Sequence, residues 1–223
     1  MPDRGARKRP AYVGPAQFQP QTARTSALRR QNVNEEGERF LIVCEGGKTE
    51  PLYFEGFRVP GKILEIKGTG YNTLTLVDEA IRLKNEAESA YDQVWCVFDR
   101  DSFPPDDFSS AISKAKAAGF RVAYTNEAFG LWYLLHFEGH RTALSRKQYS
   151  PKLSVRLGHK YEKNSRSIYD ELHCKQEEAI RRAESLLAEY GMDHKPHQDN
   201  PCTTVHLLVK ALRRNVTPRP NDL

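Results

Sequence analysis

The feature that most constrains the fold is a short apolar run that ends on acids. The run extends from Val94 to Phe98 and is followed by Asp99 and Asp101. A helical pattern precedes it and two prolines follow it, which indicates a buried strand that ends at the carboxyl edge of a sheet. In open α/β sheets, sites form in the crevice beyond these carboxyl ends. Two carboxylates there repel each other, so the pattern favours compensation by a hard cation such as Mg²⁺.

The same arrangement occurs once more, upstream. A second apolar run, Phe40 to Cys44, ends at Glu45 and two glycines. If the two strands lie side by side, Glu45 would converge with the acids that follow the other strand. Acids at strand ends also cap turns as ordinary solvated carboxylates. On spacing alone, both the metal site and the plain turn stay open.

Apolar strand patterns and helical patterns alternate along the chain. This alternation predicts an α/β fold with a Rossmann-like, parallel-rich sheet of about four strands and helices on both faces. The strand patterns stop after residue 138, so the C-terminal part is predicted to be helical from about residue 140. The predicted strands cover residues 39–45, 62–67, 94–99 and 120–124, and the predicted helices cover 49–57, 72–90, 104–118, 128–137, 175–190 and 203–213.

Composition divides the chain into a tail and a domain. With 223 residues, 39% of them hydrophobic, the chain can bury one good core or two small ones. Residues 1–37 have no apolar periodicity and are predicted to be a disordered basic tail, followed by a single domain over 38–213 and a short tail over 214–223. Residues 1–31 contain seven Lys or Arg and one Asp, whereas the whole chain is only +5. The tail could contact phosphates or simply aid solubility.

The cysteines and the hydropathy bear on location. Four scattered cysteines with no Cys-x-x-Cys pair indicate a reducing compartment without a disulfide framework. No apolar run is long enough to span a membrane, and the N-terminus has no hydrophobic signal core. We therefore expect a cytoplasmic protein that is not bound to a membrane.

Four blocks of sequence resemble the RloB family, in the right order. They cover residues 41–54, 126–138, 160–163 and 200–205, and the resemblance extends from about residue 38 to about residue 212. Glu45 followed by glycines, and later Asp99-x-Asp101, is also similar to the Toprim metal site. By that resemblance Asp99 and Asp101 would bind one or two Mg²⁺ ions (or Mn²⁺). Glu45 would either complete the metal site or act as general acid or base.

The resemblance implies a metal-dependent phosphodiester nuclease that cleaves DNA or RNA in abortive-infection defence against phage. A separate ATPase of the AAA or ABC type is the implied partner. One position departs from the family pattern: Gly130 stands where the resemblance leads us to expect Glu. The alternative is therefore a non-catalytic subunit that binds nucleic acid or the ATPase. Oligomeric state stays open, a homo-oligomer included. Primase and topoisomerase activity are disfavoured, because the chain has no template-holding domain and no evident gate tyrosine.

The glycine turn after the first strand has a further interpretation. Gly46-Gly47-Lys48-Thr49 is no Walker A loop, because Ile42 occupies the position of its first glycine. Backbone N–H groups at a helix start still suit a phosphate, so Lys48 is a candidate for the scissile phosphate. The plain alternative is an exposed lysine in a β–α turn.

Other polar residues complete the list of candidates. A basic and aromatic cluster around Tyr161 could bind a nucleic-acid backbone and stack a base, or could be a solvated loop. The spacing of the histidines near residues 194–206 is not that of a zinc finger and favours a polar loop. The remaining candidates are Lys160, Lys163 and Arg166 for nucleic acid, Glu50 as a further metal ligand, and Glu127 and His136 as neighbours of the site.

Overall fold

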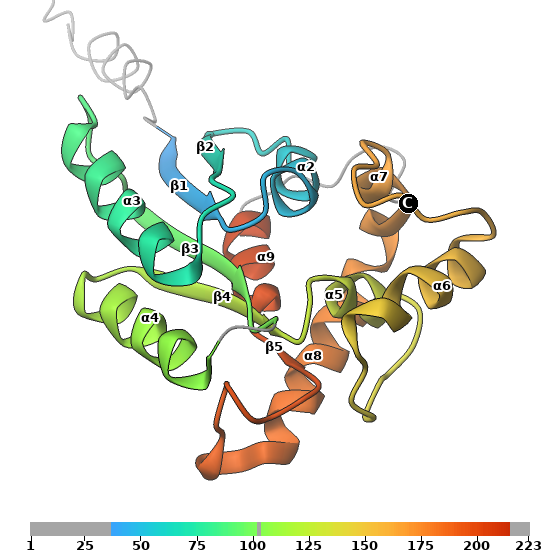
Figure 1. Ribbon diagram of the computed structural model, residues 1–223. Coiled ribbons are helices and arrows are strands. Elements are labelled where there is room, and N and C mark those ends of the chain that lie inside the picture. Colours follow the sequence, from blue (N-terminus) through green and yellow to red (C-terminus); the bar gives the residue numbers. More distant parts are fainter. Residues whose placement is uncertain (1–36, 102–103, 215–223) are drawn as a thin grey trace, which may run out of the picture. The chain divides into compact units, whose positions relative to one another are not determined.

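The computed structural model describes residues 37–101 and 104–214 (Figure 1). The predicted N-terminal tail, apart from its last residue, and all but the first residue of the predicted C-terminal tail lie outside these ranges. Within them the chain forms an α/β unit built on one sheet. The strand order is β2-β1-β3-β4-β5, and the first four strands are parallel. The strands are β1 (Glu38–Cys44), β2 (Lys62–Gly68), β3 (Gln93–Asp99), β4 (Arg121–Asn126) and β5 (Cys202–Thr203).

Two helices cover one face of this sheet. Helices α3 (Thr73–Glu86) and α4 (Pro105–Ala117) lie side by side there (Figure 1). Their buried residues, among them Leu76 and Phe108, join alternate residues of the strands, among them Val43, in one apolar cluster. Alternate strand residues point to opposite faces, so the remaining strand residues face the second layer.

The second face carries the larger apolar cluster. It joins Ile42 and Val97 of the strands to α2, α5, α8 and α9, and aromatic rings such as Tyr53 and Trp132 pack edge to face within it. The predicted helices on both faces are therefore confirmed. The elements that contribute to this cluster are α2 (Thr49–Glu55), α5 (Gly130–Leu135), α6 (Arg146–Leu157), α7 (Ile168–Leu172), α8 (Gln176–Tyr190) and α9 (Val205–Arg213). The short helix η1 (His173–Lys175) follows α7, and η2 (Gly191–Asp193) follows α8.

The sheet has one strand more than predicted. β5 pairs antiparallel with β4 at the edge of the sheet, through Thr125 with Thr203 and Asn126 with Cys202. Two residues are too few to show an alternating pattern, so this strand gave no signal in the sequence. Helix α9 follows it directly and packs its apolar side into the core.

The starts of α2 and α3 differ in how they are capped. In α2, Thr49 is the first helical residue and Lys48 occupies the N-cap without a side-chain hydrogen bond. Asn72 does cap α3, since its side chain accepts a hydrogen bond from Thr75 N at 3.0 Å. Helix α6 lies in the part predicted to be helical but was not among the individual helices predicted, because Pro151 inside it and its mostly polar sequence hide the helical pattern.

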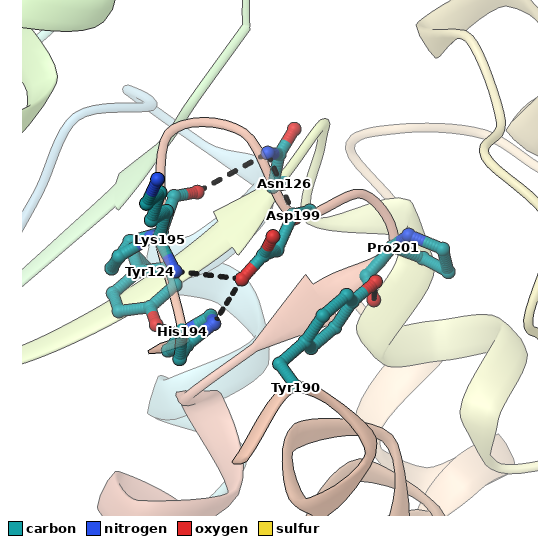
Figure 2. A network of polar contacts seen from close by, with 8 residues as sticks. Tyr124, Asn126, Tyr190, His194, Lys195, Asp199 and Pro201 are labelled. Carbon is teal, nitrogen blue, oxygen red and sulfur yellow. Dashed lines mark hydrogen bonds and ion pairs between the residues drawn. The ribbon is translucent and has the colours of Figure 1, made fainter. Parts of the chain in front are cut away.

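A loop between η2 and β5 is fixed to the end of β4 by polar contacts (Figure 2). Asn126 Nδ2 donates to the carbonyl oxygens of Pro196 at 3.2 Å and Asp199 at 2.9 Å. The Asp199 carboxylate lies 2.6 Å from His194 Nδ1 and accepts from Lys195 N at 2.7 Å. The polar loop predicted in place of a zinc site is thus an ordered segment beside β4.

Two features bear on the expected location, the state of the cysteines and the character of the helices. Cys44, Cys96 and Cys202 are buried, Cys174 is exposed, and all four are free thiols. Among the described residues, no helix combines the length and the apolar character that crossing a membrane requires.

Candidate active site

The turn after β1 places Glu45 beside the end of β3. Glu45 N donates to Val97 O at 2.9 Å, which continues the ladder between the two strands by one residue. On the other side, Gly70 N donates to Glu45 O at 2.9 Å. A Cβ on Gly68 would lie 2.8 Å from the carbonyl oxygens of both Gly46 and Gly47, so this close packing requires glycine there. The backbone of Glu45 is therefore held from both neighbouring strands.

Glu45 and Asp99 converge as their strand ends predicted. Asp99 N donates to Glu45 Oε2 at 3.1 Å. The Asp99 carboxylate in turn accepts from Phe129 N at 2.9 Å, at the start of α5. The two acids therefore come from neighbouring parallel strands, and the loop before α5 orients the second of them.

Glu50 is a third carboxylate at this place. It lies in the first turn of α2, is only 6% exposed, and its Oε2 atom is buried without a hydrogen-bond partner. A Cβ on Gly46 would lie 1.9 Å from that same oxygen, so the side chain folds back over the glycine turn. A buried carboxylate oxygen without a donor is costly unless a proton or a cation compensates it.

Asp101 meets a cation rather than the other acids. Its carboxylate forms an ion pair with Arg146, the first residue of α6. Asp101 adopts a positive φ of 39°, and its N–H donates to Glu127 O at 3.0 Å, so the backbone turns sharply after β3. Arg100 N donates to Thr125 O at 2.8 Å, and Arg100 Nε to His197 O at 3.2 Å, which holds this turn against β4 and the polar loop.

A small cavity of about 50 Å³ lies between the acids and a basic, aromatic wall. Glu50 and Asp99 line one side, and Arg146 and Lys163 bring positive charge to it. The lining therefore combines carboxylates with positively charged side chains. The complete lining is Thr49, Glu50, Asp99, Ala128, Phe129, Gly130, Arg146, Tyr149, Ser150, Tyr161 and Lys163.

The three acids share an unusual electrostatic environment. Burial, with a smaller contribution from the nearby Glu50, raises the pKa of Glu45 to about 7 against the opposing effects of the Asp99 N–H and Arg146. Burial and the charges of Glu50 and Glu45 raise the pKa of Asp99 well above its usual range. Burial also raises the pKa of Glu50, against its own N–H, Arg146 and Lys163. The cluster is thus short of positive charge despite the two nearby basic residues.

These residues fit a divalent cation by their chemistry. Carboxylate oxygens are the ligands that Mg²⁺ prefers, and the orphaned Glu50 oxygen marks a place where a cation would compensate burial. As the side chains stand, no three His, Cys, Asp or Glu residues within the described ranges are grouped to hold a metal ion. Since the Asp101 carboxylate is engaged by Arg146, its use as a ligand would require that ion pair to open.

The predicted phosphate-binding residues do not all gather here. Lys163 lines the cavity, whereas Lys160 lines a separate hollow beside Tyr161 and His159. Arg166 lies in a third hollow, with Arg58. Lys48 is exposed at the start of α2, on the glycine turn. The structure therefore brings only Lys163 of these four into the lining of the acidic cavity.

Of the two predicted neighbours of the site, His136 lies in the core, whereas Glu127 lies beside the turn at Asp101. His136 is 1% exposed within the aromatic core, where its ring packs on Trp132 and its Nδ1 atom lies 2.9 Å from Trp132 O. Burial lowers the pKa of His136 to about 3, so the ring is neutral in the core. Glu127 contributes its backbone carbonyl to the turn at Asp101.

Gly130 is explained by its neighbour on α6. A Cβ at this position would lie 2.8 Å from both Cβ and Cγ of Tyr149, which is buried. The position where the family resemblance leads us to expect Glu is therefore closed by an aromatic ring. A larger residue at Gly130 requires α6 or Tyr149 to move.

Arg146 is the residue that sequence reasoning missed. It follows Ser145, which forms a capping box with Gln148, and Ser145 N donates to Gln148 Oε1 at 2.8 Å. The Ser-x-x-Gln pattern could have marked the start of a helix. Nothing in the sequence near Arg146 indicates that it would face acids on two strand ends.

Comparisons with known proteins give one match. The family model described as RloB-like protein matches residues 40–212. Comparisons with curated proteins and with solved structures found no match.

Proposed function

This chain belongs to the RloB-like family, and from this premise we propose that it is a metal-dependent phosphodiester nuclease of the Toprim type. The observation that carries the proposal is the contact of Glu45 with Asp99 at the carboxyl ends of β1 and β3, beside Glu50 of α2, whose buried carboxylate oxygen is unpartnered. A setting in anti-phage defence, with a separate ATPase, is part of the same proposal. It rests on the resemblance of the sequence blocks.

Each residue has a role in this mechanism. Asp99 and Asp101, with Glu45 or Glu50, would hold Mg²⁺ or Mn²⁺. The bound cation would supply Lewis-acid stabilisation of the phosphate oxygens and a more acidic water. Glu45, with its pKa of about 7, is suited to take the proton from the attacking water near neutral pH. Lys163 and the exposed Lys48 would hold the polynucleotide backbone by its phosphates.

The test is cleavage of plasmid DNA and of total RNA with Mg²⁺, Mn²⁺ or EDTA. Wild type is compared with Asp99→Asn and with Asp107→Asn, an exposed acid of α4 that serves as the matched control. We expect cleavage only with metal, lowered at least about 100-fold by Asp99→Asn and unchanged by the control. Equal cleavage by wild type and Asp99→Asn would contradict the proposal, since asparagine keeps the shape and removes only the charge.

A second candidate is a non-catalytic subunit that binds nucleic acid or an ATPase. Gly130 favours it, because Tyr149 fills the space that an acidic side chain would need. Under this proposal wild type binds an oligonucleotide with steep salt dependence but does not cleave it. Cleavage gained by the double variant Gly130→Glu with Tyr149→Ala, and not by Tyr149→Ala alone, would identify the chain as a disabled relative. Metal-dependent cleavage by wild type would exclude this candidate.

A further inference from the structure

Arg146 is fixed at the mouth of the acidic cluster by its place in the chain. It is the first residue of α6, directly after the capping box of Ser145 and Gln148. Its side chain is 50% exposed, it forms an ion pair with Asp101, and it lines the same cavity as Lys163. The start of the helix fixes the backbone of Arg146, whereas its exposed guanidinium can exchange one ion-pair partner for another.

The charges around Arg146 exceed what it can neutralise. Its positive charge opposes the raised pKa of Glu45, Glu50 and Asp99 as well as pairing with Asp101. One guanidinium thus faces four carboxyl groups. A divalent cation would bind the same carboxylates, so the two cations would compete for them.

We propose that Arg146 is the phosphate-binding cation of this site, and that its ion pair with Asp101 holds it until a divalent cation takes over that carboxylate. The inference rests on the proposed function. A guanidinium matches a phosphate group by paired hydrogen bonds, which is a stronger and more directional contact than a lysine makes. Opening of the ion pair frees Asp101 for the metal and Arg146 for the phosphodiester in the same movement.

Metal binding and polynucleotide binding are coupled in a defined direction. While Arg146 pairs with Asp101, it competes with the metal, so its removal makes metal binding tighter. Metal binding releases Arg146, so the metal makes polynucleotide binding tighter in wild type. A residue that only stabilised the fold would produce neither effect.

The experiment separates metal binding from polynucleotide binding. Wild type, Arg146→Gln, Arg146→Lys and Lys147→Gln are compared; Lys147 is the next residue of α6, is exposed and forms no ion pair within the described residues. Mn²⁺ is titrated by calorimetry without nucleic acid. A fluorescent single-stranded oligonucleotide is then titrated by anisotropy, once in EDTA and once in Ca²⁺, a hard cation with the same preference for oxygen ligands.

The expected results differ among the variants. Arg146→Gln binds Mn²⁺ about 2- to 5-fold tighter, because the competing ion pair is gone. The same variant binds the oligonucleotide in Ca²⁺ about 10-fold more weakly than wild type. Arg146→Lys lies between wild type and Arg146→Gln, and Lys147→Gln resembles wild type in both titrations.

The contrary results are equally distinct. Unchanged or weaker Mn²⁺ binding in Arg146→Gln would overturn the inference. It would also be overturned if Arg146→Gln bound the oligonucleotide in Ca²⁺ as tightly as Lys147→Gln does. In both cases wild type still binds Mn²⁺, so the proposed nuclease stands. If wild type binds no Mn²⁺, the metal-dependent function and this inference fail together. Circular dichroism of each variant confirms that α6 remains folded.

Discussion

Glu45 combines a strand-end position with a carboxyl group that titrates near neutrality. Its pKa is raised from 4.5 to about 7, chiefly by burial. Between these two values the folded chain keeps a proton that the unfolded chain releases, so this group makes the fold less stable as the pH rises through the window. A bound cation would reverse the effect by favouring the ionised carboxylate.

Urea unfolding in EDTA at several pH values tests this prediction. We expect the free energy of unfolding of wild type, relative to that of Glu45→Gln, to fall by about 1 to 3 kcal/mol from about pH 5 to about pH 8. The Gln variant has no proton to release at this position, so the difference reports the Glu45 carboxyl together with its effect on the pKa of Asp99. A difference that does not change with pH would show that Glu45 ionises normally in the fold.

The close contact between Gly130 and Tyr149 leads to a prediction about packing. Gly130→Ala places a methyl group against the Tyr149 ring, so we expect a loss of about 1 to 3 kcal/mol in the free energy of unfolding. Gly139→Ala is the matched control, because a Cβ there meets no atom within 4 Å. In a double-mutant cycle with Tyr149→Ala, which removes Cγ and the ring but keeps Cβ, the cost of Gly130→Ala should become smaller. An equal cost with and without the Tyr149 ring would contradict the contact.

At the scale of elements, the loop before β5 supports the turn that carries Asp101. His197 accepts a hydrogen bond from Arg100 through its carbonyl, and Ser109 Oγ of α4 lies 3.2 Å from His197 Nδ1. Asp199 closes the same loop through His194 and Lys195 (Figure 2). The loop is therefore a link between the sheet edge and the candidate site.

Asp199→Ala tests this link. It removes the carboxylate that accepts from His194 and Lys195, which should lower the free energy of unfolding by about 1.5 to 3 kcal/mol. We expect proteolysis to become faster within residues 191–201 and the metal affinity at the site to fall several-fold. Asp193→Ala, an exposed acid just before this loop, is the control. Loss of stability without any change in metal affinity would show that the loop supports the sheet but not the site.

The sequence predicted the elements whose signal is local. Four parallel strands followed from apolar runs between helical patterns, and the meeting of Glu45 with Asp99 followed from two such runs ending on acids. β5 was missed because a strand of two residues is too short to show an alternating pattern. α6 was missed as an individual helix because Pro151 interrupts its helical pattern. The ion pair of Arg146 depends on how α6 packs, which no local pattern encodes. Asp101 was therefore expected among the acids, whereas the structure pairs it with a cation.

At the scale of the whole molecule, charge is unevenly distributed along the chain. The tail, whose residues 1–36 lie outside the described ranges, holds most of the excess positive charge, and the folded unit is close to neutral. If the tail contacts phosphates, full-length protein with Arg4, Arg7, Lys8 and Arg9 changed to Gln should bind an oligonucleotide with a shallower salt dependence. Slopes of binding against salt for this variant and for wild type measure the effect. Identical slopes would assign the tail to solubility.

The pairing of β5 with β4 has a consequence for how the protein is made. Thr203 Oγ1 donates to Tyr124 O at 3.0 Å, across 79 positions of sequence, and α9 completes the core only after that point. While a ribosome synthesises the intervening residues, β4 therefore presents an open edge with unpaired backbone groups, the kind of surface on which nascent chains aggregate. Acids that repel each other are meanwhile gathered at the ends of β1 and β3, before Arg146 and Lys163 have arrived. A polypeptide stalled just before residue 202 should accordingly depend on chaperones far more than the finished protein does.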